Sequence, residues 1–123
     1  MGKADGRAGV RVDVLGPLRL VVDRVPVDVR GPKRRAVLAL LALAEGRALP
    51  VDTLLDALWP TELPDSGRQA LHSHVSRLRA QLGPAADRLT TLQDGYRLDL
   101  HPDELDLARG RALLRTGRTE VAP

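Results

Sequence analysis

Short segments with apolar side chains in the first thirty residues of the chain predict strands. Val10–Leu15 alternates apolar and polar residues, which is typical of a half-buried strand, and Leu18–Asp23 predicts a second strand. A Gly-Pro pair at positions 16–17 predicts the turn between them. Val25–Val29 predicts a short third strand, in which Pro26 is tolerated if the strand lies at a sheet edge. The beginning of the chain is therefore expected to form a small antiparallel sheet.

The following apolar positions recur every three to four residues and predict helices. A first helix runs from about Lys33 to Glu45, opens at a Gly-Pro pair at 31–32 and ends before Gly46. It is apolar nearly all round, so we expect it to be the buried central helix. A short second helix, Val51–Leu58, follows, and Trp59 is expected to plug the core under the next loop.

A third helix is predicted for residues 66–82. Its apolar residues recur at i, i+4, i+7 and i+11 and form one stripe, made of Leu71, Val75, Leu78 and Leu82. Ser66, followed three residues later by Gln69, predicts a capping box, and a Gly-Pro pair at 83–84 ends the helix. The second and third helices, joined by a loop on top of a buried first helix, form a helix-turn-helix arrangement.

The face of the third helix opposite this stripe carries hydrogen-bonding side chains and no carboxylate. The helix contains three arginines and no acid, whereas an ordinary surface helix mixes both signs of charge. We therefore predict that it reads DNA in the major groove, with Arg77 as the candidate for bidentate contact with guanine. The alternative is an ordinary solvated surface helix. The predicted base-reading residues are Gln69, His72, Ser73, Ser76 and Arg77.

Two short strands, Arg88–Leu92 and Tyr96–Leu100, are predicted around an Asp-Gly turn, the strongest short hairpin signal. A hairpin directly after such a helix is a wing, which can hold the sugar-phosphate backbone beside the groove. For Tyr96 the alternative is a core position that anchors the hairpin, and the two roles do not exclude each other. The predicted phosphate contacts are Arg68, Arg79, Arg88, Thr90, Thr91, Tyr96 and Arg97.

Two further segments carry charge patterns. Lys33, Arg34 and Arg35 crowd the first turn of the first helix, where the helix dipole disfavours cations. A phosphate or the carboxylates of the sheet would compensate them, and plain solvation is the third possibility. Asp103–Arg115 is acidic first and basic last and predicts a fourth helix. The sequence shows no partner for its leucines, so we expect the chain to continue as a larger protein, and for residues 116–123 no structure is predicted.

The composition describes one domain with an aliphatic core. Of the 123 residues 43% are hydrophobic, with no Phe, one Trp and one Tyr. The formal charge of +3 and the pI near 10.2 permit a nucleic-acid partner without requiring one. The absence of cysteine excludes disulfides and thiolate metal sites. Residues 1–9 are expected to be a disordered lead-in rather than a signal peptide, and no apolar run could span a membrane, so we expect a soluble, cytoplasmic protein.

The sequence disfavours an enzyme. His72 and His74 are two residues apart on a helix and point apart, so they cannot share a metal with each other. No Gly-rich phosphate loop, nucleophile elbow or carboxylate pair stands out. We therefore expect no catalysis, no cofactor, no metal and no small-molecule substrate. The remaining alternative is a winged helix that binds only another protein, which the arginines of the third helix disfavour.

Taken together, these elements resemble the winged-helix domains of OmpR/PhoB-type regulators. They are more closely similar to the N-terminal domain of the Streptomyces antibiotic regulatory protein family, the AfsR/DnrI/RedD type. The motifs that carry this resemblance are Val14 to Leu18, Pro32 to Leu41, Leu54 to Pro60 with its Ala-Leu-Trp-Pro end, Val75 to Arg79 with Leu82-Gly83, and Gly95 to Leu98. Residues Asp103 to Leu107 resemble the start of that family's bacterial transcriptional activation domain.

The resemblance implies an α+β fold in residues 10–100, a winged helix-turn-helix with an N-terminal antiparallel sheet, three helices and a C-terminal hairpin. Residues 101–123 would then be the first helix of a truncated activation domain. It also implies a transcription activator, typically of antibiotic gene clusters, that binds direct repeats in double-stranded promoter DNA as tandem protomers and is nucleoid-associated when bound.

The resemblance further implies that the loop between the second and third helices contacts RNA polymerase. The residues of this loop are Trp59, Thr61, Glu62, Leu63 and Asp65. Two positions depart from the family pattern. Pro50 stands where a capping Ser or Thr is common, and Gly110 stands where the following helix usually has an aromatic residue.

Overall fold

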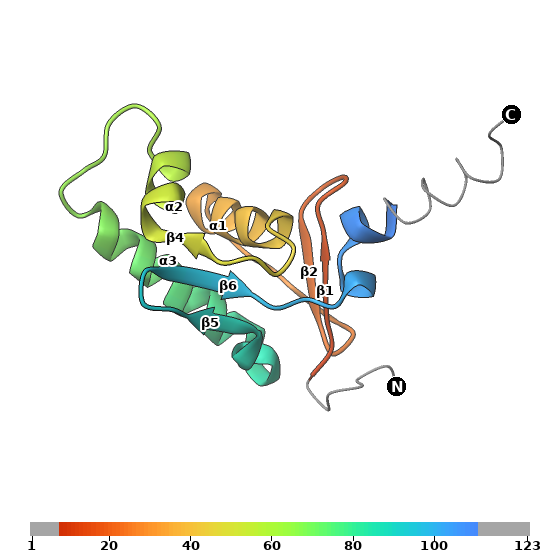
Figure 1. Ribbon diagram of the computed structural model, residues 1–123. Helices are drawn as coiled ribbons and strands as arrows, with labels where there is room; N and C mark the ends of the chain where they lie inside the picture. The colour runs from red at the N-terminus through yellow and green to blue at the C-terminus, as the bar shows by residue number, and fades with distance from the viewer. Residues whose placement is uncertain (1–7, 111–123) are drawn as a thin grey trace, which may run out of the picture.

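The structure is a computed structural model that describes residues 8–110. The N-terminal sheet has three strands and lies beside the helices α1, α2 and α3, and a second small sheet lies in front of α3 (Figure 1). Most of the predicted lead-in and the last part of the predicted fourth helix lie outside the described residues. This is the α+β winged helix-turn-helix arrangement that the sequence predicts.

The N-terminal sheet consists of β1 (Val10–Asp13), β2 (Arg19–Val22) and β3 (Val25–Val27), paired antiparallel in the order β1-β2-β3. Alternate residues face the core, as predicted: Val10, Val12, Leu20 and Val22 are buried. Asp23 and Arg24 both have positive φ, which is the geometry of a tight two-residue hairpin turn. The strands are shorter than predicted: β1 and β3 end before the predicted segments do, and β2 is shorter at both ends.

The first helix, α1 (Pro32–Leu43), lies between the sheet and the other helices. Its buried residues are Val37, Leu38, Leu41 and Ala42. Leu43 is 43% exposed, so the prediction of a helix buried nearly all round is wrong at its last turn. Glu45 and Gly46 adopt positive φ, which ends the helix near its predicted boundary.

The second helix, α2 (Val51–Leu58), has the predicted bounds. Pro50 precedes it without a side-chain cap, and the N–H of Val51 instead donates to the carbonyl of Asp94 in the hairpin turn (2.8 Å). The two residues before the helix form β4 (Leu49–Pro50), a strand that the sequence analysis missed. A strand of two residues leaves no periodicity to detect.

The third helix, α3 (Gly67–Leu82), buries the predicted stripe of Leu71, Val75, Leu78 and Leu82. The predicted capping box is wrong, because the Ser66 side chain makes no cap hydrogen bond. Ser66 has φ −86° and ψ 10°, whereas a capping residue usually has extended backbone. The chain enters α3 through a turn in which the Gly67 N–H donates to the Pro64 carbonyl (2.9 Å).

The wing follows the 3₁₀ segment η1 (Gly83–Arg88) and consists of β5 (Leu89–Thr91) and β6 (Gly95–Leu98). With β4 they form a sheet in the order β4-β6-β5. A Cβ at Gly95 would overlap the backbone of Leu49, so only glycine allows β4 and β6 to come this close. The hairpin predicted from its Asp-Gly turn is confirmed, with a third strand added.

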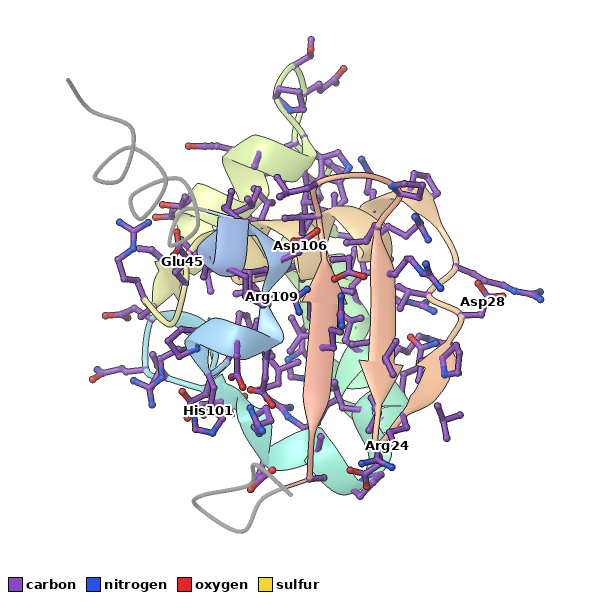
Figure 2. The ribbon with its side chains drawn as sticks, turned by 90° about the vertical axis from the view of Figure 1, so that its right-hand side faces the viewer. Arg24, Asp28, Glu45, His101, Asp106 and Arg109 are labelled. Carbon is purple, nitrogen blue, oxygen red and sulfur yellow. The ribbon has the colours of Figure 1, made fainter. Side chains whose placement is uncertain are left out.

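The segment after the wing packs on the N-terminal sheet. It contains the 3₁₀ turn η2 (Pro102–Glu104), and Leu105 pairs with Val12 in a parallel bridge and is 2% exposed. The Asp106 carboxylate accepts hydrogen bonds from the N–H groups of Val14 (2.8 Å) and Leu15 (2.9 Å). Although burial alone would raise the pKa of Asp106, these bonds keep it below its usual value. Figure 2 shows Asp106 and Arg109 beside β1.

The prediction that the leucines of this segment lack a partner is therefore wrong for Leu105. A local sequence pattern cannot show that the chain returns to a segment more than ninety positions earlier, as the hydrogen bond that the Val14 N–H donates to Asp106 requires. Residues 106–110 are helical, and beyond them the predicted helix lies outside the described residues. The domain boundary at residue 100 stays a prediction. Among the helices of residues 8–110, none combines the length and the hydrophobicity that a membrane span requires.

Candidate nucleic-acid interface

The outward face of α3 is an exposed polar surface. Because the apolar stripe lies in the core, helix geometry turns the opposite side chains to solvent. The exposed residues on this face are Gln69, His72, Ser73, Ser76, Arg77 and Ala80. The Arg77 side chain makes no hydrogen bond or ion pair with any residue of the range 8–110. The structure therefore brings together all five side chains that the sequence predicts to read bases, on one surface without a carboxylate.

Arg79, on the flank of that face, joins α3 to the wing. Its Nε donates to the Leu89 carbonyl (3.1 Å) and its Nη2 to the Thr91 Oγ1 (2.7 Å). Two residues predicted to contact phosphate are thus bonded to each other, and they set the position of the wing against the helix. A guanidinium has five N–H groups, so Arg79 keeps further donors for an anion.

Arg68, at the beginning of α3, forms an exposed ion pair with Asp52 in the first turn of α2 (2.7 Å). The two side chains are 67% and 79% exposed, and pairs of this kind contribute about 0–1 kcal/mol. Little free energy would be lost if Arg68 left this carboxylate for a phosphate. Sequence reasoning missed Asp52 because the acid lies on another helix.

Arg88 is the one predicted phosphate contact that the structure contradicts. Its side chain is 1% exposed. Its two terminal nitrogens donate to both carboxylate oxygens of Glu104 (2.7 and 2.9 Å) and to the carbonyls of Asp99 and Ala8 (each 2.9 Å). The prediction is wrong because a charge buried and paired in this way cannot reach a DNA backbone. Arg88 instead joins the start of the wing to the segment that follows it, through its hydrogen bonds to Asp99 and Glu104.

The remaining wing residues divide between its two faces. Thr90 pairs with Arg97 across β5 and β6, and both are half-buried, on the face away from Leu89 and Leu98. Tyr96 lies on the core side and is 6% exposed, so its ring anchors the hairpin as the alternative reading proposed. A phosphate contact by its hydroxyl, and those by Thr90 and Arg97, stay predictions.

The loop between α2 and α3 stands away from the rest of the molecule in Figure 1. Thr61, Glu62, Leu63 and Asp65 are exposed, and Leu63 is 49% exposed although it also contacts Gly67. Trp59 is half-buried against the core, as predicted. The loop therefore exposes an apolar side chain and two acids to solvent, while Trp59 at its start packs against the core.

Two of the three bases at the start of α1 have structural partners. Lys33 Nζ donates to the carbonyl of Leu58 at the end of α2 (2.8 Å) and lies 4.7 Å from the centre of the Trp59 ring. Arg35 donates to the carbonyls of Val29 (3.0 Å) and Leu18 (3.4 Å). The sequence analysis considered a phosphate, the carboxylates of the sheet or solvent as compensation for these bases. For Lys33 and Arg35 all three are wrong, because backbone carbonyls compensate their charges.

No group of three or more metal-ligating side chains lies together in the described part of the chain.

Residues 29–98 match the model of the family described as "Transcriptional regulatory protein, C terminal". Transcriptional regulatory protein EmbR of Mycobacterium tuberculosis is 41% identical over 100 residues, which are 78% of this chain and 26% of EmbR. Regulatory protein AfsR of Streptomyces coelicolor is 39% identical over 105 residues, 85% of this chain and 10% of AfsR. This chain thus spans about a quarter and a tenth of these relatives. The resemblance to AfsR-type regulators is confirmed.

Solved structures agree with this relationship. A structure of M. tuberculosis EmbR in complex with a low-affinity phosphopeptide has a TM-score of 0.80 and 38% identity, and the match covers 86% of this chain and 29% of that one. DrrB, an OmpR/PhoB homologue of Thermotoga maritima, has a TM-score of 0.56 over 67% of this chain and 38% of its own. At 16% identity the likeness to DrrB supports the fold alone.

Proposed function

This chain belongs to the transcriptional regulatory protein C-terminal family of OmpR/PhoB-type domains, and from that premise we propose that it binds promoter DNA sequence-specifically. In this proposal α3 lies in the major groove and the wing lies along the adjacent backbone. The observation that carries the proposal is the outward face of α3, a continuous exposed surface of amide, hydroxyl, imidazole and guanidinium groups without a single acid.

The proposed base contacts follow from the chemistry of each side chain. Arg77 is exposed and unpaired among the described residues, and a free guanidinium is suited to the O6 and N7 of guanine. The amide of Gln69 is suited to the N6 and N7 of adenine, and Ser73 and Ser76 to either purine or pyrimidine edges. His72 stands beside them on the flank that faces the wing.

The proposed backbone contacts are those that position α3 without reading sequence. They comprise Arg68, Arg79, Thr90, Thr91, Tyr96 and Arg97. Arg79 has a double role, because it holds the wing through Leu89 and Thr91 and presents its remaining N–H groups to a phosphate.

We further propose that the chain is part of a transcription activator of an antibiotic or other secondary-metabolite gene cluster. Its protomers would bind direct repeats in tandem and act at the nucleoid in the cytoplasm. The loop from Trp59 to Asp65 would contact RNA polymerase through Leu63 and the acids Glu62 and Asp65. The exposure of this loop and the similarity to AfsR support this part of the proposal.

Selection of bound sequences from random duplex DNA, followed by gel-shift titration of the selected site, tests the proposal. Arg77→Ala is expected to cost about 1–3 kcal/mol of binding to the selected site and much less on a scrambled duplex. Equal losses on both duplexes would remove Arg77 from base readout. Failure to enrich any sequence, with a folded protein that captures another protein, would support the alternative of a winged helix used only for protein contact.

A further inference from the structure

Lys33, in the first turn of α1, is bound to the end of a different helix. Its Nζ donates to the carbonyl of Leu58, the last residue of α2 (2.8 Å), and lies 4.7 Å from the centre of the Trp59 ring. The dipole of α1 disfavours a cation at this position, whereas the dipole of α2 favours a cation at its C-terminal carbonyls. The contacts of Lys33 are therefore explained by α2 and not by its own helix.

The end of α2 needs a donor from elsewhere in the molecule. Carbonyls in the last turn of a helix have no partner within that helix. The Trp59 N–H still donates to the Leu55 carbonyl (2.9 Å), but the next residue, Pro60, has no N–H to donate. Lys33 supplies a donor here, and its ammonium lies over the face of the indole ring, which is an attractive arrangement. Both contacts are made at the junction between α2 and the loop that follows.

This loop has few hydrogen bonds of its own. None of the backbone N–H groups of residues 61–65 donates a hydrogen bond within residues 8–110. At the far end of the loop, the Gly67 N–H donates to the Pro64 carbonyl (2.9 Å), and Leu63 lies so close to Gly67 that a Cβ there would overlap it. A segment with so few bonds depends for its shape on the contacts at its two ends.

Between its two ends the loop presents one apolar side chain and two carboxylates. Leu63 is 49% exposed, and Glu62 and Asp65 are exposed and make no ion pair or hydrogen bond with the described residues. Such a surface is complementary to an apolar spot flanked by cations. The contacts at the ends of the loop decide where these three side chains point, and Lys33 makes those at the first end.

We infer that Lys33 is a positioning residue for the polymerase contact. It fixes the end of α2 and the Trp59 ring, and thereby presents Leu63 between its two acids to a basic surface of the polymerase. This inference rests on the proposed function, in which the loop is the contact. Lys33 itself then touches neither DNA nor polymerase, and it acts by raising the fraction of loops that are ready to bind.

The first measurement uses the fluorescence of Trp59, the only tryptophan among the 123 residues. In the free chain, Lys33→Met keeps the aliphatic stem and removes the ammonium, so we expect a shift of the emission to longer wavelength and stronger quenching by acrylamide. Lys33→Arg, which keeps a cation, is expected to resemble the wild type. Arg24→Gln removes a cation at the β2–β3 turn (Figure 2) and is expected to leave the emission unchanged. Circular dichroism melts establish that each variant is folded.

The second measurement is the recruitment of purified RNA polymerase holoenzyme to the full chain on a promoter duplex that carries the selected site. Lys33→Met is expected to weaken polymerase binding to this complex about three- to tenfold, because loss of both contacts lowers the fraction of competent loops. The affinity of this variant for the duplex alone, and the slope of log Kobs against log salt, are expected to stay at the wild-type values. Lys33→Arg is expected to restore recruitment.

Unchanged Trp59 emission, or unchanged recruitment by Lys33→Met while the wild-type complex binds polymerase, overturns the inference and leaves the proposed function intact. A salt slope reduced by about 0.9 also overturns it, because Lys33 would then be a phosphate contact. If the wild-type complex binds no polymerase, the proposed loop contact fails, and the inference fails with it. Should Lys33→Met not fold, Lys33→Gln replaces it in both measurements with the same criteria.

Discussion

The ion pair between Arg88 and Glu104 predicts a large loss of stability when Glu104 is replaced by alanine. Arg88 is 1% exposed and the Glu104 side chain 13% exposed, and two charge-assisted hydrogen bonds join them. Removal of one partner leaves the other as an uncompensated buried charge, which costs about 3–5 kcal/mol. Glu104→Ala also removes the acceptor for the N–H groups of Val10 (3.1 Å) and His101 (2.8 Å). We therefore expect the upper part of this range.

The effect is expected to depend on pH. Burial alone would raise the pKa of Glu104, but the hydrogen bonds from Arg88, His101 and Val10 hold it below its usual 4.5. A carboxyl with a depressed pKa contributes stability that is present above its unfolded pKa and is lost as the pH falls through its folded pKa. Wild-type protein should lose this contribution below about pH 4.5, and Glu104→Gln should show a flatter acid limb.

Urea unfolding followed by circular dichroism measures both effects. Asp103→Ala removes an exposed acid from the same turn and is expected to cost less than about 0.5 kcal/mol. The double variant Arg88→Met/Glu104→Leu, which removes both charges, is expected to cost less than the sum of its single variants. A free energy of unfolding for Glu104→Ala within about 0.5 kcal/mol of that for Asp103→Ala would refute the reasoning, because the buried pair would then contribute nothing.

Three further predictions concern the wing and α3. Arg97→Ala is expected to weaken binding to cognate and scrambled duplexes alike and to reduce the salt slope by about one unit in gel-shift titrations; a loss confined to the cognate duplex would contradict a phosphate contact. Gly95→Ala is expected to destabilise the protein by about 1–3 kcal/mol in thermal unfolding, since its methyl group would overlap the Leu49 backbone; an unchanged melting temperature would contradict this close approach. Ser66→Ala is expected to change the free energy of unfolding by less than about 0.5 kcal/mol, because the Ser66 hydroxyl makes no cap hydrogen bond with α3. A cost near about 1 kcal/mol would indicate that the predicted capping box does form.

The predictable part of the candidate site was the face of a single helix. Once α3 was recognised from its leucine and valine stripe, a rotation of about 100° per residue determined that Gln69, Ser73 and Arg77 point outward together. The wing was similarly local, because an Asp-Gly pair between two short apolar runs is sufficient to form a hairpin. Both follow from neighbours in the sequence.

The roles of individual cations could not be predicted in this way. Arg68, Arg79 and Arg88 looked equivalent in the sequence, yet one is paired at the surface, one is bonded to the wing and one is buried. Each outcome depends on an acceptor supplied by another element. Lys33 and Arg35 likewise donate hydrogen bonds to backbone carbonyls, whereas the Nε of Arg34 has no hydrogen-bond partner within residues 8–110.

The sequence by itself therefore determined the order of the elements apart from β4, the apolar faces and the polar surface of α3, because hydrophobic periodicity acts over a few residues at a time. The tertiary structure decided which charges remain exposed at the surface and which are buried in pairs. It did so because a buried charge must be paired, and the pairs that satisfy this requirement here join residues as far apart as Ala8 and Arg88 or Val10 and Glu104.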